Sequence, residues 1–300
     1  MYQHVKKVQT SFALQKGQLH LKVIPFKEKA AQLVQLRSQY AAYIARLNAA
    51  RLNVARPQTP RLTKKALLVG INYVGTGNAL YGCINDVNSV NTHLMSKGFT
   101  CQLITDNTAT RETILNAFKL LLVNAVAGDV LVFHYSGHGS YVRDTNRDEI
   151  DGYDEAIVSR DMKYILDDEF KTLLMNYLKK DVTLFALFDS CHSGTMLDLK
   201  YQYMDSLHGA DVVYPKNLAT AGKVYMMSGC MDQQTSADAF IQNKAQGAMT
   251  WAWLESLKTK QSTWRELLRS MRTLLKDNGF DQIPQFSAGT LVDIDAQVFI

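Results

Sequence analysis

From residue 66 onward, short apolar runs alternate with segments of helical periodicity, and this alternation constrains the fold more than any other feature of the chain. Short, mainly apolar runs predict strands at 66–73, 101–106, 129–137, 181–190 and 223–230. Helical spacing of apolar residues predicts helices at 84–98, 108–125, 167–180, 247–258 and 263–277. Strands that are apolar on both faces are typical of a parallel sheet covered by helices. The sequence therefore predicts an α/β fold with a mostly parallel central sheet and helices on both faces. A further strand is expected at the C-terminus, at 291–300.

The first part of the chain differs from the rest in charge. Of the 33 basic and 28 acidic residues in the chain, residues 1–65 hold 13 Lys or Arg and a single acid, Glu28. A short strand, a helix and a proline-containing linker are predicted in turn at 19–24, 27–52 and 55–65. We expect residues 1–64 to form a basic region that precedes a domain at 65–300. A solvated helix is favoured over a nucleic-acid or membrane contact for this region.

Composition excludes several classes of protein. No apolar run is long enough to cross a bilayer, and the N-terminus has no apolar stretch followed by a cleavage site, as a secretory signal would. The four cysteines have neither metal-site nor disulfide spacing, which favours a reducing, cytoplasmic environment. We expect a monomer with no nucleic-acid and no membrane partner.

Two of the predicted strands run into glycine-flanked polar residues, in "HYSGHGS" at 134–140 and "LFDSCHSG" at 187–194. Sites in parallel sheets form beyond the carboxyl ends of the strands, and a thiol becomes a nucleophile when a nearby base lowers its pKa. Cys191 is therefore predicted as a nucleophile and His138 as its base, with the backbone amides of Gly139 and Cys191 facing an oxyanion. His192 is a rival base, but neighbours on a strand point to opposite faces.

Three polar residues stand close to this predicted pair. Asp189 lies two residues before Cys191, Ser136 lies two before His138, and Asp86 begins a predicted helix. Each has an ordinary alternative role, such as a helix cap or a partner for backbone amides. Gathered near one thiol, they would form an acidic pocket that suits Arg or Lys and repels Asp.

Acidic residues also gather in two other places. The segment at 143–155 is typical of a solvated acidic loop, and Asp167 and Asp168 are typical of the first turn of a helix, where the helix dipole favours negative charge. Neither pattern alone predicts a metal site.

Eight stretches, in this order, resemble those of metacaspases, the caspase-like cysteine proteases of plants, fungi, protists and microbes. The resemblance runs from about Lys65 to the C-terminus and implies a caspase-haemoglobinase fold. It also implies peptide-bond hydrolysis after Arg or Lys by a Cys191–His138 dyad, through a thioester on the cysteine. The stretches are "ALLVGINY", "GCINDV", "HYSGHGS", "DGYDEAI", "LDDEF", "FDSCHSG", "SGCMDQQTSADA" and "GAMTWAWLESL".

The resemblance also implies which residues bind substrate and metal. The substrate pocket would be lined by Cys83, Asp86, Ser136 and Asp189. Calcium would be bound by Asp154, Asp167, Asp168 and Asp198, with Asp151 as a substitute for Asp154. We expect calcium to order the segment after Cys191 and stimulate activity, and no organic cofactor is expected.

The short spacing after Cys191 resembles the short-linker, type I metacaspases. It divides the catalytic domain into a large-subunit-like part at 65–200, a linker at 201–222 and a small-subunit-like part at 223–300. Six basic residues in exposed stretches are candidate points for self-cleavage, although an ordinary surface role is the alternative for each: Arg56, Arg61, Lys64, Lys200, Lys216 and Lys223. The alternative interpretation is a catalytically silent scaffold on the same fold, since a fold does not secure an activity.

Overall fold

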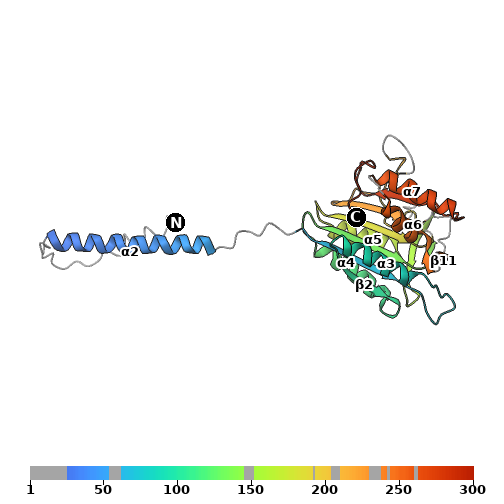
Figure 1. Ribbon diagram of the computed structural model, residues 1–300, viewed down its shortest axis with the longest axis horizontal. Coiled ribbons are helices and arrows are strands. Elements are labelled where there is room, and N and C mark those ends of the chain that lie inside the picture. The colour runs from blue at the N-terminus through green and yellow to red at the C-terminus, as the bar shows by residue number, and fades with distance from the viewer. Residues whose placement is uncertain are drawn as a thin grey trace. The chain divides into compact units, whose positions relative to one another are not determined.

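The computed structural model describes residues 26–53, 62–144, 152–191, 193–203, 210–229, 238–241, 244–259 and 263–300. The chain divides into two units, Met1–Thr59 and Pro60–Ile300, and each is described by itself. In the first unit, the predicted helix is present as α2 (Phe26–Asn53) (Figure 1). The strand predicted at 19–24 and most of the predicted linker lie outside the described residues. None of the helices in the described ranges is long and apolar enough to cross a membrane.

The second unit is built on an eight-stranded sheet with the order β2-β1-β3-β7-β10-β13-β8-β9. The first five strands in this order are parallel, and the last three join antiparallel. The predicted α/β fold with a mostly parallel sheet is thus confirmed. The strands are β1 (Lys64–Gly70), β2 (Thr100–Thr105), β3 (Val130–Ser136), β7 (Thr183–Asp189), β8 (Tyr201–Tyr203), β9 (Val212–Val213), β10 (Lys223–Ser228) and β13 (Gln285–Ala288).

Helices cover both faces of this sheet, as the doubly apolar strands predict. On one face, Phe133 of β3 packs edge-on against Phe118 of α4, with ring centroids 5.0 Å apart. On the other face, Phe185 of β7 stacks between Trp253 and Trp264, at 5.9 and 5.5 Å. The helices are α3 (Cys83–Ser96), α4 (Arg111–Val123), α5 (Asp167–Tyr177), α6 (Ala248–Lys258) and α7 (Trp264–Asp277), with one 3-10 turn, η1 (Asp106–Thr108).

Two small antiparallel sheets were not predicted from the sequence. One consists of β4 (Gly139–Arg143), β5 (Tyr153–Val158) and β6 (Tyr164–Leu166), and the other of β11 (Asp238–Ile241) and β12 (Lys244–Gly247). The prediction of a solvated acidic loop is wrong for its last residues. Asp154 and Glu155 are buried, because β5 pairs with both β4 and β6.

One further prediction of local structure is corrected. Residues 291–300 do not form a strand: Gln297 makes only an isolated bridge to Thr263, and the apolar periodicity instead buries Ile294 and Ile300 in the core. The segment predicted as a linker, 201–222, contributes β8 and β9 to the far edge of the sheet. In both segments, packing against the rest of the chain decides the local structure rather than intrinsic propensity.

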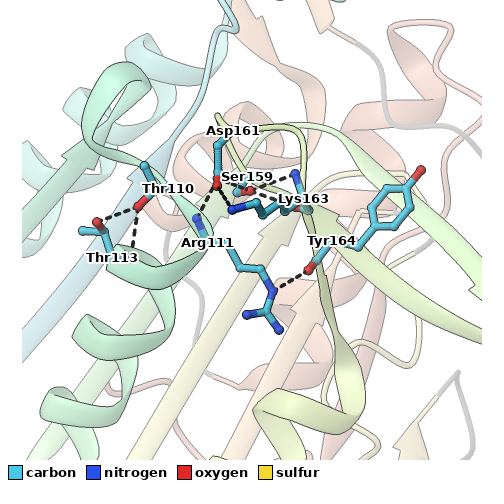
Figure 2. A network of polar contacts seen from close by, with 7 residues as sticks. All are labelled: Thr110, Arg111, Thr113, Ser159, Asp161, Lys163 and Tyr164. Atoms are coloured by element: carbon cyan, nitrogen blue, oxygen red, sulfur yellow. Dashed lines mark hydrogen bonds and ion pairs between the residues drawn. The ribbon is translucent and has the colours of Figure 1, made fainter.

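A polar network fixes the turn between β5 and β6 to the start of α4 (Figure 2). Asp161 Oδ1 accepts hydrogen bonds from the Arg111 backbone N–H at 2.9 Å and the Ser159 hydroxyl at 2.7 Å, and Lys163 Nζ lies 3.0 Å from Asp161 Oδ2. Burial raises the pKa of Asp161, but these donors outweigh it and hold the pKa well below its ordinary value. The Arg111 guanidinium donates to the Tyr164 carbonyl at 3.0 Å. The network thereby anchors β6, which runs directly into α5.

Candidate active site

The two glycine-flanked motifs follow neighbouring strands. In the parallel pairing of β3 with β7, Ser136 is in register with Asp189, the last residue of its strand. The backbone N–H of Gly137 donates to the Asp189 carbonyl at 3.3 Å, one step further along. His138 and Cys191 therefore leave the sheet at the same edge, at the carboxyl ends of adjacent strands, where sites form in such sheets.

Gly139 and Cys191 approach each other so closely that only a glycine fits at position 139. A Cβ at this position would overlap the carbonyl oxygen of Cys191. The glycine beside the histidine thus marks the point where the two motif segments meet. Cys191 itself is partly exposed and forms no disulfide with another described cysteine, while His192, the rival base, lies outside the described residues.

The imidazole of His138 is held by two neighbouring groups. Its Nε2 lies 2.7 Å from the backbone carbonyl oxygen of Asn78, and its ring packs on the ring of Tyr73 with centroids 4.6 Å apart. With the proton on Nε2 donated to that carbonyl, Nδ1 keeps a lone pair that can accept a proton. The arrangement therefore favours the tautomer that a general base needs.

Two tyrosine hydroxyls fix the backbone of His138. Its N–H donates to the Tyr73 hydroxyl at 3.0 Å, and its carbonyl accepts from the Tyr135 hydroxyl at 2.7 Å. Burial raises the pKa of both tyrosines, so both hydroxyls remain protonated. Tyr73 has a left-handed φ of 52°, and Asp106 Oδ1 supports it by accepting the N–H groups of Asn72 and Tyr73 at 2.9 and 3.0 Å.

Sequence reasoning missed the role of Tyr73. It ends the stretch "ALLVGINY", but its hydroxyl contacts residues more than sixty positions away. A buried tyrosine with a positive φ, which is uncommon for a bulky residue, is visible only in the structure.

Two buried carboxylates lie at the start of α6. Asp86 Oδ2 accepts the Ser136 hydroxyl at 2.7 Å, and both Asp86 oxygens lie 3.0 Å from the N–H of Gly247. Asp189 Oδ2 accepts the N–H of Thr250 at 2.8 Å. The N-terminus of a helix favours negative charge, so α6 stabilises both side chains in their ionised form.

Gly247 stands between these two carboxylates. A Cβ there would overlap Asp189 Oδ2 and lie 2.8 Å from Asp86 Oδ2. Cys83, the first residue of α3, is buried, one turn before Asp86 on the same helix. Sequence reasoning proposed Asp86, Asp189 and Ser136 as neighbours in one pocket, but it gave Gly247 and Thr250 no role.

Three of the four predicted metal ligands are close together. Carboxylate oxygens of Asp167, Asp168 and Asp198 lie within 4.8 Å of one another. Burial and the charge of Asp198 raise the pKa of Asp167 to about 8. The ammonium of Lys171 lies 3.3 Å from Asp198 Oδ2 and offsets part of this negative charge.

The fourth predicted ligand, Asp154, is buried on β5 and does not join the group of three that the described residues form. Its neighbour Glu155 contacts one member of the group: the Glu155 N–H donates to Asp167 Oδ2 at 2.7 Å, and the Glu155 carboxylate accepts the Thr195 hydroxyl at 2.5 Å. Asp151 lies outside the described residues. Clustered carboxylate oxygens fit a hard cation such as Ca²⁺.

Comparison with known proteins agrees with the fold and these motifs. A family profile described as metacaspase, peptidase C14 domain, matches residues 64–200. Metacaspase-1 of Meyerozyma guilliermondii is 35% identical over 77% of this chain and 71% of its own length. The corresponding values are 36%, 77% and 72% for Metacaspase-1A of Aspergillus terreus, and 35%, 77% and 68% for Metacaspase-1 of Schizosaccharomyces pombe.

A solved structure shares the fold at lower sequence identity. The crystal structure of protein GSU0716 from Geobacter sulfurreducens matches with a TM-score of 0.61 and 24% identity, covering 79% of this chain and 97% of that one. Sheet, helices and motif order together define a caspase-like α/β protein. The chain belongs to the metacaspase family and is a cysteine-type endopeptidase that acts on protein substrates.

Proposed function

We propose that the protein hydrolyses peptide bonds that follow Arg or Lys, with Cys191 as the nucleophile and His138 as the base. The observation that carries this proposal is the pair of buried carboxylates, Asp86 and Asp189, at the sheet edge from which both residues emerge. Carboxylates form strong, charge-assisted hydrogen bonds with guanidinium and ammonium groups, so this pair suits the side chain of Arg or Lys. Cys83 and Ser136 complete the proposed pocket, and an aspartyl side chain would be repelled from it.

In the proposed reaction, His138 Nδ1 takes the proton of the Cys191 thiol, and the sulfur attacks the carbonyl carbon of the scissile bond. The backbone N–H groups of Gly139 and Cys191 stabilise the resulting oxyanion. The same imidazole then protonates the leaving amine, which departs and leaves a thioester. Water, deprotonated by His138, hydrolyses the thioester and regenerates the thiol.

Calcium stimulation forms part of the proposal. Asp167, Asp168 and Asp198 would hold the ion, and a further oxygen would come from Asp154 or Asp151. Bound calcium would neutralise the clustered carboxylates, whose repulsion adds to burial in raising the pKa of Asp167. Because Asp198 lies seven residues after Cys191, fixing its carboxylate would also restrain the segment that follows the nucleophile.

Self-processing is proposed at Lys216. A protease binds its substrate as an extended, accessible segment, and Lys216 lies exposed in a turn between β9 and β10. Lys64 and Lys223 begin strands of the central sheet, which protects their peptide bonds. Intact mass measurement should show cleavage after Lys216 in the wild type and none in the Cys191→Ala variant. Cleavage elsewhere would reject the assignment.

A monomer is also proposed. β8 and β9 extend the sheet beyond β13, so the inner strand β13 is not available for pairing with a second copy. Light scattering across a range of protein concentrations measures this directly, and a stable dimer would overturn it.

Peptide hydrolysis tests the main proposal. Wild type, Cys191→Ala and His138→Ala are assayed on peptides that differ only in Arg, Lys or Asp before the scissile bond, each with calcium and with chelator. We expect arginyl and lysyl cleavage by the wild type with calcium, and none by either variant. Preferred cleavage after Asp would reject the pocket assignment. Full activity in chelator would reject the calcium requirement, and an inactive wild type would favour a scaffold.

A further inference from the structure

A groove of about 520 Å³ lies between α3 and α6, away from the carboxylates at the start of these helices. The apolar part of its lining comes from α6, with Trp251, Leu254 and Leu257. His93 of α3 and Lys244 of β12 add polar groups. None of these five residues has a role in the proposed peptidase chemistry.

Two residues that line this groove each have a buried ring nitrogen without a hydrogen-bond partner in the described parts of the chain. One is Nε1 of Trp251, a residue that is only 7% exposed. The other is Nε2 of His93. An indole N–H can only donate, and a buried donor without an acceptor is costly, so an acceptor atom from a ligand would be stabilised here.

The charges around the groove favour an anionic acceptor. Lys244 is exposed at the groove, and a second cation, Lys258, lies 2.6 Å from Glu255 in an ion pair. The lining therefore carries two ammonium groups and one carboxylate, beside an apolar wall of leucine and indole. An oxygen anion attached to an apolar body matches this combination.

We propose that the groove between α3 and α6 binds small carboxylic acids with an apolar body. The indole ring of Trp251 turns toward the groove, so that its N–H, buried in the free protein, donates to the carboxylate. The carboxylate also lies near His93 and Lys244, while the apolar body packs on Leu254 and Leu257. This is a binding site separate from the catalytic edge of the sheet.

The position of the groove couples it to the substrate pocket, an inference that rests on the proposed function. Asp86 belongs to α3, whereas Gly247 and Thr250 stand at the start of α6, so the Gly247–Asp86 hydrogen bonds join the two helices. A ligand that also joins them favours the helix spacing in which the pocket is assembled. Coupling between binding sites is reciprocal, so substrate and carboxylic acid should each strengthen binding of the other.

Binding can be read from the indole signals, because the chain has three tryptophans. In ¹⁵N-labelled full-length Cys191→Ala protein, Trp251→Phe assigns the reporter signal. We expect 2-naphthoate to shift the Trp251 signal saturably and to leave Trp264 unmoved, with 2-naphthylmethylamine giving no saturable shift. Lys244→Glu should weaken naphthoate binding at least fivefold, and the matched change Lys180→Glu, at another exposed lysine, should not.

Three results would overturn the site: no saturable shift with naphthoate, an equal shift with the amine, or unchanged binding in Lys244→Glu. His93→Leu provides a second variant should Lys244→Glu fail to fold, and it should also weaken binding. Coupling is tested on wild-type enzyme, where naphthoate should lower KM for an arginyl peptide at least twofold. Naphthoate binding with an unchanged KM would reject the coupling alone, while naphthoate binding without any peptidase activity would reject the proposed function and leave the site standing.

Discussion

The backbone N–H of Gly247 lies 3.0 Å from both carboxylate oxygens of Asp86, a residue 161 positions earlier in the chain. This contact joins the start of α6 to the first turn of α3 and places Asp86 beside Asp189. The absence of a side chain at Gly247 is what allows the two carboxylates to share this position.

Gly247→Ala should damage recognition of basic substrates. The added methyl group overlaps Asp189 Oδ2, so the carboxylate must move and lose its optimal geometry. Losing a charge-assisted hydrogen bond costs about 1.5–3 kcal/mol, so kcat/KM for an arginyl peptide should fall about tenfold or more, mainly through KM. Gly77→Ala, where a Cβ meets nothing within 4 Å, is the matched control. Unchanged kinetics in Gly247→Ala would contradict the pocket assignment.

Tyr73→Phe should slow catalysis without weakening substrate binding. The substitution removes the acceptor of the His138 backbone N–H but keeps the ring that packs on the imidazole. A misplaced base costs roughly tenfold in kcat, with KM nearly constant. Tyr81→Phe, at a tyrosine that is 71% exposed, is the control. A change in KM alone would show that Tyr73 positions substrate rather than the base.

Lys171→Met should strengthen calcium binding. Its ammonium lies 3.3 Å from Asp198 Oδ2 and competes with a cation for that carboxylate. Removing it should lower the calcium Kd roughly tenfold, equivalent to about 1.4 kcal/mol. Calorimetric titration of a Cys191→Ala background measures this, with Lys163→Met as the control and Asp198→Asn expected to weaken binding. Weaker binding in Lys171→Met would show that the lysine supports the site instead.

Acid should destabilise the fold through His134. Burial lowers its pKa to about 4, although a hydrogen bond with the Leu187 carbonyl at 3.2 Å opposes the shift. The unfolded chain takes up this proton near pH 6.5 and the folded chain only near pH 4, so stability falls as pH drops between these values. The loss should reach about 2.5 kcal/mol at pH 4.5 relative to pH 7. Urea unfolding at several pH values compares the stability of wild type with that of His134→Leu. An equal pH dependence in both proteins would contradict the assignment of this loss to His134.

Asp161→Asn should loosen the network at the start of α4 (Figure 2). The amide weakens the hydrogen bonds from Arg111 and Ser159 and removes the attraction to Lys163. The cost should be about 1–2 kcal/mol in unfolding free energy at pH 7. Because the folded pKa is depressed, the wild-type advantage should persist above pH 4 and shrink at lower pH. Lys163→Ala measures how much of this cost comes from the ion pair. An unchanged free energy of unfolding in Asp161→Asn would show that the network does not stabilise the fold.

The sequence by itself determined the central strands, the helices between them and the edge at which Cys191 and His138 emerge. These features follow from local periodicity, since a run apolar on both faces must be covered on both faces. The order of the motifs was enough to predict the family and the fold.

Only the tertiary structure decided what holds these groups in place. The short strands β4, β5 and β13 carry weak local signals and form because partners are available, and the grouping of Asp167 with Asp198 depends on how the segment after β7 returns to α5. The contacts of Tyr73 and Gly247 join residues more than sixty positions apart. Local pattern specifies which groups face a core, but the distance between two such groups is set by the packing of the whole chain.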